Sequence, residues 1–272
     1  MSAIACLKVA PIIWATQTKA ATSITNFKGG TAMIQVENLK RVYKKHGQTV
    51  GLLDASFTVP NGQIVGVLGV NGAGKTTLLR TMAGLLMPSG GTALFDGKSA
   101  REIYARMSYI TGEGSYISCL TVGEYGEFLR DVHPAFSQQR YDKFCEFLKL
   151  DKSDLISRMS TGQRSRIEVA AGFAKKADYY LLDEPFLGKD IFVRRDVLKL
   201  ISATLDGGET ILLTTHYIED IDAFIDRAII MNDGVIAKDI EMDEIRANGS
   251  SLVKEMAAAC GWNEESYLKF EE

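Results

Sequence analysis

The stretch that most restricts the fold is GVNGAGKT, residues 69–76, which has the spacing G-x-x-x-x-G-K-[ST]. It continues the apolar run IVGVLG, residues 64–69, which predicts a buried strand, and a helix is expected from about Lys75. Glycines let backbone N–H groups curve around phosphate oxygens, while the lysine and the hydroxyl that follow reach the β- and γ-phosphates and Mg²⁺. The alternative is a glycine-rich turn with an incidental lysine, and the strand–loop–helix context favours phosphate. The predicted nucleotide-binding residues are Asn71, Gly72, Ala73, Gly74, Lys75, Thr76 and Thr77.

A second stretch, YYLLDEP at residues 179–185, supports this interpretation. Its four apolar residues place Asp183 at the carboxyl end of a central strand, where open α/β sheets bind their ligands. We expect Asp183 and Thr76 to hold Mg²⁺, and Glu184 to polarise an attacking water. An Asp-Glu pair alone is normally a solvated loop, but this one stands downstream of a phosphate-binding loop and behind a buried strand.

Composition excludes several classes of protein. The 272 residues carry a net charge of −3, which gives no electrostatic case for nucleic acid as a ligand. The four cysteines form no CxxC pair, so a zinc site or a disulfide framework is not expected. The chain lacks the roughly 20 consecutive apolar residues of a membrane-spanning helix. Residues 1–32 fit a secretory signal poorly, and we expect them to be disordered or to precede the true start at Met33.

The order of the remaining patterns predicts an α/β core. Residues 33–59 alternate as in an antiparallel sheet, with Leu53, Ala55, Phe57 and Val59 expected on one face. Residues 120–158 have helical periodicity. The runs YYLLDEP and TILLTTH (residues 210–216) suit parallel strands covered on both faces, and AIIMNDGVIAK predicts a hairpin that turns at residues 232–234.

A third polar stretch, MSTGQRSR at residues 159–166, begins an apolar-periodic helix and exposes backbone N–H groups, which suits an anion. Together with GVNGAGKTT, YYLLDEP, FLGKD and TTH in this order, it resembles the nucleotide-binding domain of ABC-type ATPases. The resemblance covers residues from about Met33 to at least Lys238. It implies a P-loop NTPase (RecA-like) core with an antiparallel β subdomain and a helical insertion. The implied domains are an extension at 1–32, the nucleotide-binding domain at 33–245 with its helical subdomain at about 114–160, and a helical tail at 246–272.

The resemblance also implies a purpose for the second anion site. In this family two domains pack head to tail, and the signature loop of one covers the γ-phosphate held by the P-loop of the other. Ser160, Gly162 and Gln163 match the family's Leu-Ser-Gly-Gly-Gln signature, whereas Met159 replaces its Leu and Thr161 its first Gly. Ser160, Gly162 and Gln163 are therefore expected to bind the nucleotide of a partner domain.

Other roles carry over one residue at a time. Tyr43 matches the aromatic residue that stacks on adenine, with an exposed strand tyrosine as the alternative. His216 matches the switch histidine that contacts the γ-phosphate, and Asp190 matches the loop that crosses between the two domains. An ungapped alignment places Gly112 at the position of the family's loop Gln or Glu, and we expect the adjacent Glu113 to replace it.

The resemblance implies an ATPase with ATP and Mg²⁺ as its nucleotide and metal. We expect the ATP-binding subunit of a transporter, in the cytoplasm on the inner face of the cell membrane. Its expected partners are a second nucleotide-binding domain, identical or not, and separate transmembrane permease subunits, with no nucleic acid. The alternative is a soluble ABC ATPase in an assembly role, like an iron–sulfur scaffold protein. The sequence does not encode the transported substrate or the direction of transport.

Overall fold

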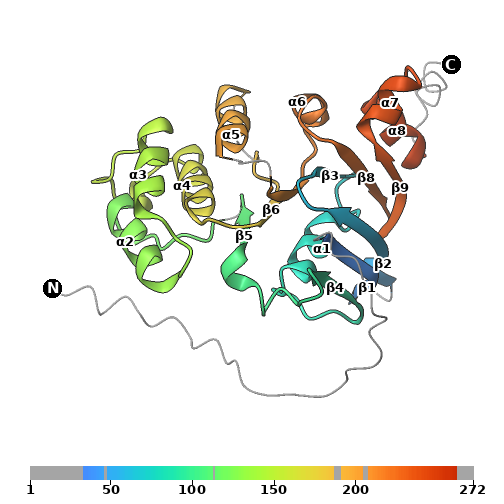
Figure 1. Ribbon diagram of the computed structural model, residues 1–272, viewed down its shortest axis with the longest axis horizontal. Coiled ribbons are helices and arrows are strands. Elements are labelled where there is room, and N and C mark those ends of the chain that lie inside the picture. Colours follow the sequence, from blue (N-terminus) through green and yellow to red (C-terminus); the bar gives the residue numbers. More distant parts are fainter. Residues whose placement is uncertain (1–32, 46–47, 113, 187–190, 205–207, 262–272) are drawn as a thin grey trace. The chain divides into compact units, whose positions relative to one another are not determined.

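The computed structural model describes residues 33–45, 48–112, 114–186, 191–204 and 208–261 (Figure 1). The chain divides into residues 1–31 and residues 32–272, and the first of these units lies wholly outside the described residues. The second unit contains all of the described residues.

One mixed sheet organises this unit, and its described strands follow the order β4-β1-β2-β9-β8-β3-β7-β6-β5. The strands are β1 (Met33–Lys45), β2 (Gln48–Pro60), β3 (Ile64–Leu68), β4 (Gly90–Phe95), β5 (Met107–Thr111), β6 (Tyr179–Asp183), β7 (Thr210–Thr214), β8 (Arg227–Asn232) and β9 (Val235–Glu241). The helices are α1 (Lys75–Met82), α2 (Val122–Val132), α3 (Gln138–Phe147), α4 (Thr161–Ala174), α5 (Ile191–Thr204), α6 (Ile218–Ile221), α7 (Met242–Ala247) and α8 (Leu252–Ala259). Two short 3₁₀ turns cover Tyr104–Arg106 and Ile156–Arg158. The predicted α/β fold class is confirmed.

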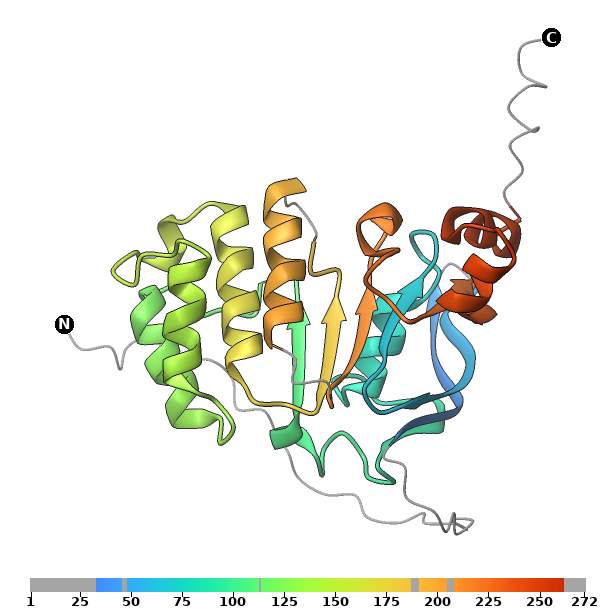
Figure 2. The same ribbon diagram turned by 45° about the horizontal axis from the view of Figure 1, so that its top comes forward.

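The parallel part of the sheet is buried on both faces, as its continuous apolar runs predict. Every residue of β6 and β7 is buried, and successive side chains enter two different cores. Tyr179, Leu181 and Leu212 pack with α1 and the antiparallel strands. The intervening residues, Tyr180 and Leu182 among them, pack with α4 and α5. Figure 2 shows β5, β6 and β7 side by side and pointing the same way.

The antiparallel part contains one departure from the sequence prediction. Ala55, Phe57 and Val59 are buried as expected, but Leu52 is fully buried and Leu53 is only half-buried. The register explains the difference, because β2 has one more residue than β1 between the pairs Leu39↔Ala55 and Arg41↔Leu52. Such a bulge moves the preceding side chains to the opposite face.

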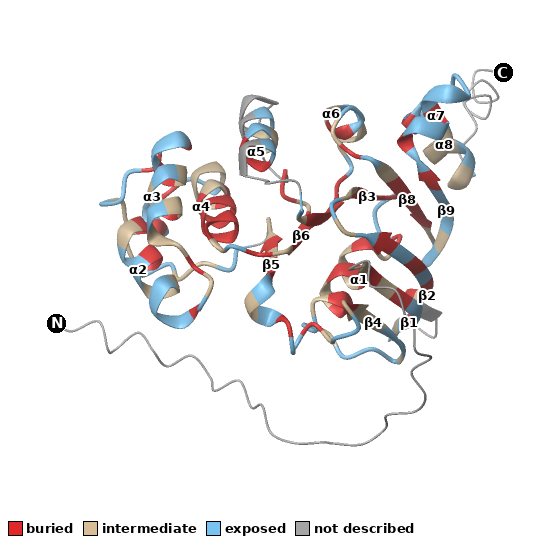
Figure 3. Cartoon of the chain, viewed as in Figure 1, coloured by how far each residue is buried: buried red, intermediate tan, exposed pale blue. Residues whose placement is uncertain are grey.

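Helices α2, α3 and α4 lie together beyond β5, at the edge of the sheet (Figure 1). Gly126 of α2 makes this packing possible, since a Cβ there would lie 2.4 Å from the ring of Tyr141 in α3. The Tyr141 hydroxyl is held in turn by a 2.9 Å bond that it donates to the carbonyl of Val122. Figure 3 shows buried residues on α4 and exposed residues on the outer turns of α2 and α3.

The carboxyl ends of the neighbouring strands β3, β7 and β6 lie at the same end of the sheet. Thr214 of β7 pairs with both Val67 of β3 and Asp183 of β6, so these ends are in register. The predicted hairpin of β8 and β9 is also present, and its two turn residues Asp233 and Gly234 have φ values of 47° and 80°. The loops that follow these carboxyl ends therefore lie next to one another.

Candidate functional site

The loop between β3 and α1 contains three glycines whose φ values residues with a side chain rarely adopt. Gly69 has φ 148°, and a Cβ there would lie 2.3 Å from the carbonyl oxygen of Met231. Gly74, with φ 102°, begins α1 in the left-handed conformation. Gly72 has φ 87° and open space where a Cβ would be. The loop thus takes a shape that glycines favour, and Gly72 leaves its outer side open for a ligand.

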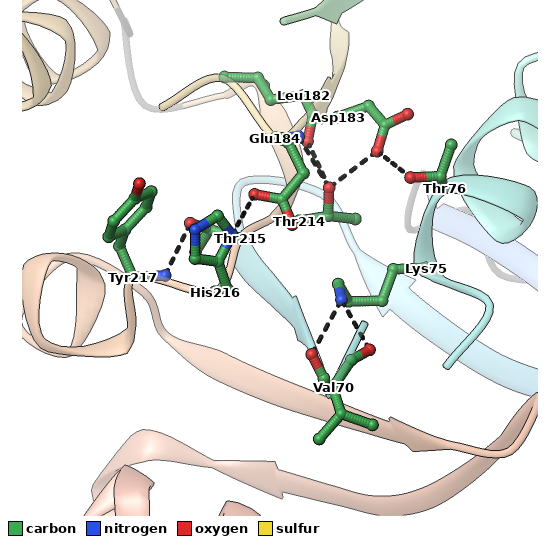
Figure 4. Close-up of polar contacts among 11 residues, drawn as sticks. Val70, Lys75, Thr76, Leu182, Asp183, Glu184, Thr214, Thr215, His216 and Tyr217 are labelled. Carbon is green, nitrogen blue, oxygen red and sulfur yellow. Dashed lines mark hydrogen bonds and ion pairs between the residues drawn. The ribbon is translucent and has the colours of Figure 1, made fainter. Parts of the chain in front are cut away.

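Lys75 lies across this loop rather than in solvent. Its Nζ donates to the carbonyl oxygens of Gly69 at 2.8 Å and Val70 at 3.1 Å, and the residue is 6% exposed (Figure 4). Burial lowers the pKa of the Lys75 ammonium, and the nearby carboxylates of Glu184 and Asp183 oppose that effect. The ammonium is therefore partly desolvated beside the place where a phosphate would bind.

Asp183 is the centre of a hydrogen-bond network at the end of β6. Its Oδ1 accepts from the hydroxyls of Thr76 at 2.8 Å and Thr214 at 3.0 Å, and its Oδ2 accepts from Tyr109 at 2.7 Å. Arg80 of α1 lies 3.7 Å from the same Oδ2. Burial first, and then the charge of Asp183, raises the pKa of the Tyr109 hydroxyl, so that it remains a donor to this carboxylate.

Tyr109, Thr214 and Arg80 were not predicted from the sequence. Thr214 could have been found, because it directly precedes the Thr-His pair of TTH. The other two depend on strand order and side-chain direction. Tyr109 reaches Asp183 only because β5 pairs with β6 in the observed register.

Glu184 and His216 form a pair at the end of β6 and β7. The Nδ1 of His216 lies 3.0 Å from Oε2 of Glu184 (Figure 4). Glu184 has φ 50°, a strained value for a residue with a side chain, and its backbone N–H donates to the hydroxyl of Thr214 at 2.9 Å. This backbone conformation turns Glu184 away from the strand direction and toward the histidine.

These elements enclose a cleft of about 290 Å³. Its lining residues are Gly51, Asn71, Gly72, Gly74, Lys75, Thr76, Thr77, Glu184 and His216. Ala73 and Asp183 do not line it, since Ala73 is buried under the loop and Asp183 lies 3% exposed behind Thr76. The Thr76 hydroxyl and the Asp183 carboxylate are hard oxygen donors, which is the donor set that Mg²⁺ prefers. The residues present therefore fit that metal.

Tyr43 lies at the rim of this cleft. Its side chain is 37% exposed, and the Arg41 guanidinium lies 4.7 Å from its ring centroid. A Cβ at Gly51 would be 3.0 Å from the Tyr43 ring, so the ring packs against a residue that lines the cleft. The position is compatible with the predicted stacking on a base.

The STGQ segment is a helix cap in this chain. Ser160 Oγ accepts from the backbone N–H of Gln163 at 3.2 Å, and Gln163 Oε1 accepts from the backbone N–H of Ser160 at 2.9 Å. This reciprocal capping box starts α4. The described residues that line the cleft do not include Ser160, Gly162 or Gln163. Glu113 and Asp190, which the sequence also predicts as site residues, lie outside the described residues.

Comparison with known proteins gives consistent results. The model of the ABC transporter family matches residues 52–187, which is half of the chain. The Nod factor export ATP-binding protein I of Ralstonia nicotianae is 30% identical, over 82% of this chain and 75% of its own. The SkfA peptide export ATP-binding protein SkfE of Bacillus subtilis is 29% identical, over 86% of this chain and 99% of its own.

Solved structures show the same fold. The dimeric structure of a post-hydrolysis state of the ATP-binding cassette MJ0796, bound to ADP and Pi, superposes with a TM-score of 0.69 at 21% identity. The alignment covers 77% of this chain and 98% of that one. Each helix in the described part of the chain is too short or too polar to cross a lipid bilayer.

Proposed function

Because the chain belongs to the ABC transporter family, as an ATP-binding subunit that hydrolyses ATP, we propose that two such domains close head to tail around two ATP molecules. The separation of the two anion sites carries this proposal. The P-loop cleft exposes Asn71 and Gly72, whereas the capped start of α4 stands outside that cleft. A second domain could bring its own α4 start to the open side of the loop, where the γ-phosphate would join the two.

We propose a separate part in nucleotide binding for each of four residues: Lys75, Thr76, Asp183 and Tyr43. The Lys75 ammonium exchanges the carbonyls of Gly69 and Val70 for phosphate oxygens, which are stronger acceptors because they are charged. Thr76 and Asp183 hold Mg²⁺, which when bound neutralises charge on the phosphate oxygens. Tyr43, packed against Gly51, stacks on the adenine.

The Glu184–His216 pair supplies the hydrolytic chemistry. Glu184 takes a proton from the attacking water, so that a hydroxide-like oxygen bonds to the γ-phosphorus as the bond to the β-phosphate oxygen breaks. We assign to His216 the imidazolium form, in which both ring nitrogens donate: Nδ1 donates to the Glu184 carboxylate, and Nε2 at the opposite edge of the ring donates to a γ-phosphate oxygen. Glu113 and Asp190 complete the predicted site.

The partners follow from the names of the relatives. Two of these are export ATP-binding proteins, which supports transmembrane permease subunits as the partners of this chain and a location on the cytoplasmic face of the membrane. Closure of the dimer would pull on those subunits, and hydrolysis would release them. We assign residues 33–245 to the nucleotide-binding domain and about 114–160 to its helical subdomain. Of the predicted helical tail at 246–272, α8 lies within the described residues and residues 262–272 lie outside them.

The test is a crosslink between two chains. The four native cysteines are replaced, and Asn71→Cys and Thr161→Cys are introduced on separately tagged chains that also carry Glu184→Gln to slow hydrolysis. We expect a mixed-tag disulfide with ATP and much less with ADP, which lacks the γ-phosphate. Gln139→Cys, on the exposed side of α3, replaces Thr161→Cys as a matched control and should not crosslink. In a parallel sample one chain carries both cysteine substitutions, and a disulfide that forms only within that chain, whatever the nucleotide, would refute the head-to-tail arrangement.

A further inference from the structure

Tyr217 lies between the switch histidine and a charged pair that the hydrolytic scheme does not use. Its ring centroid is 4.0 Å from that of His216, with an angle of 38° between the planes. The guanidinium carbon of Arg194 lies 4.0 Å from the centroid of the same ring. Arg194 comes from the first turn of α5, so this stack joins α5 to the end of β7.

The arginine is itself fixed. Its Nε lies 2.9 Å from Oδ2 of Asp220 in α6, and the two side chains are only 15% and 18% exposed. Arg194 Nε makes no hydrogen bond in the described structure, so Asp220 restrains the guanidinium by charge at short range, where little solvent is available to replace either partner. Tyr217 is also tied at its backbone, because its N–H donates to the Thr215 hydroxyl at 3.1 Å. The tyrosine ring therefore has a defined position before any ligand binds.

This arrangement limits the freedom of His216. An imidazole side chain turns about two bonds, and its position requires two independent contacts. Glu184 holds one edge of the ring through Nδ1, and Tyr217 covers one face. The side chain of His216 is 40% exposed, so without Tyr217 it would have room to rotate in solvent.

We propose that Tyr217, held by Arg194 and Asp220, is a positioning residue that orients His216 for hydrolysis. This inference rests on the proposed roles of His216 and Glu184. It predicts that removing the Tyr217 ring disturbs the chemical step more than nucleotide binding, because the tyrosine touches the histidine and does not line the cleft.

Proton NMR of the histidine rings tests the geometry without using activity. The chain has three histidines, so His216→Gln identifies the His216 signals in the full-length protein. The ring current of Tyr217 should displace these signals in the wild type, and Tyr217→Leu should return them toward the values of a free histidine. Tyr217→Phe should preserve the displacement, and Arg194→Met should reduce it. Unchanged His216 signals in Tyr217→Leu would overturn the proposal.

A matched ring pair elsewhere in the chain provides the control. The Tyr104 and His133 rings pack edge to face with centroids 5.4 Å apart, at the carboxyl end of α2. Tyr104→Leu should move the His133 signals and leave those of His216 and the ATPase rate unchanged. Arg140→Met removes a guanidinium 5.8 Å from the Phe144 ring and controls for the loss of a stacked arginine.

Kinetics of the same variants test the consequence. Tyr217→Leu should lower kcat roughly tenfold and change KM for ATP by less than about twofold, with Arg194→Met in between and Tyr217→Phe close to the wild type. If Tyr217→Leu does not fold, as judged by its melting curve, Arg194→Met carries the test. Full turnover by His216→Gln and Glu184→Gln would refute the proposed function, while the NMR result would still decide the orientation. Wild-type kcat in Tyr217→Leu, with kcat lost in His216→Gln, would overturn the positioning role alone.

Discussion

The buried histidine at the end of α2 should make the folded chain sensitive to mild acid. His133 is 9% exposed and caps α2, with the ring of Tyr104 against it. Burial, and secondarily the positive charge of Lys175, lowers the pKa of His133 from 6.5 to about 4. Between these two values the unfolded chain binds a proton that the folded chain rejects, so the free energy of unfolding must decrease as the pH falls.

The size of the effect follows from the same two values. Each pH unit across that interval is worth about 1.4 kcal/mol, so the full loss at pH 4 is about 3 kcal/mol. At pH 5 the unfolded histidine is almost fully protonated and the folded one almost fully neutral, and the loss relative to pH 7 is about 2 kcal/mol. For a domain with a stability of roughly 5–15 kcal/mol this is a large fraction.

The assay is urea unfolding of the wild type and of His133→Phe at pH 7 and pH 5. The phenylalanine keeps an aromatic ring near Tyr104 but cannot be protonated, so the wild type should lose about 2 kcal/mol more than the variant between the two pH values. The carboxylates titrate in both proteins and cancel in the comparison. Equal losses in the two proteins, or an NMR titration of His133 with a midpoint near 6.5, would refute the reasoning.

Three further predictions concern the site and its support. Lys75→Ala should weaken binding of a fluorescent ATP analogue, whereas His216→Ala should bind it normally and hydrolyse ATP slowly; equal losses of affinity would contradict this division. Gly172→Ala should lower stability by about 1–3 kcal/mol in thermal unfolding, because the new Cβ would lie 2.3 Å from the Ile110 side chain. Gly51→Ala places a Cβ 2.4 Å from a backbone oxygen of β1 and should weaken ATP binding measured by calorimetry, by displacing the rim of the cleft; unaltered affinity would argue against a rim contact.

The features that depend on a local sequence pattern could be predicted from the sequence. Uniformly apolar runs identify strands covered on both faces, and such strands run parallel, so the end of β6 at Asp183 and the end of β7 before His216 had to reach one edge. The P-loop glycines could be predicted equally well, because residues with a side chain rarely adopt the positive φ values of this loop.

What the sequence could not predict depends on register and on distant contacts. Because of the bulge in β2, Leu52 is buried in the core where the alternation predicted Leu53. No local sequence pattern indicates the extra residue that forms this bulge. The roles of Tyr109 and Tyr217 also depend on distant residues, because Tyr109 contacts Asp183 and Tyr217, although adjacent to His216, is stacked against Arg194. Tyr217, for example, is placed by an arginine 23 positions before it.

Ser160, in the capping box of α4, can serve both as a helix cap and as a donor to an anion. A hydroxyl has acceptor lone pairs and one proton, and in Ser160 a lone pair receives the Gln163 N–H while the proton stays available to an incoming oxygen anion. Aspartate is as good a helix cap as serine, yet it carries no proton to give and would repel a phosphate. Alanine would lose both functions. At this position, therefore, a residue that caps the helix does not always permit contact with an anion. Serine does both.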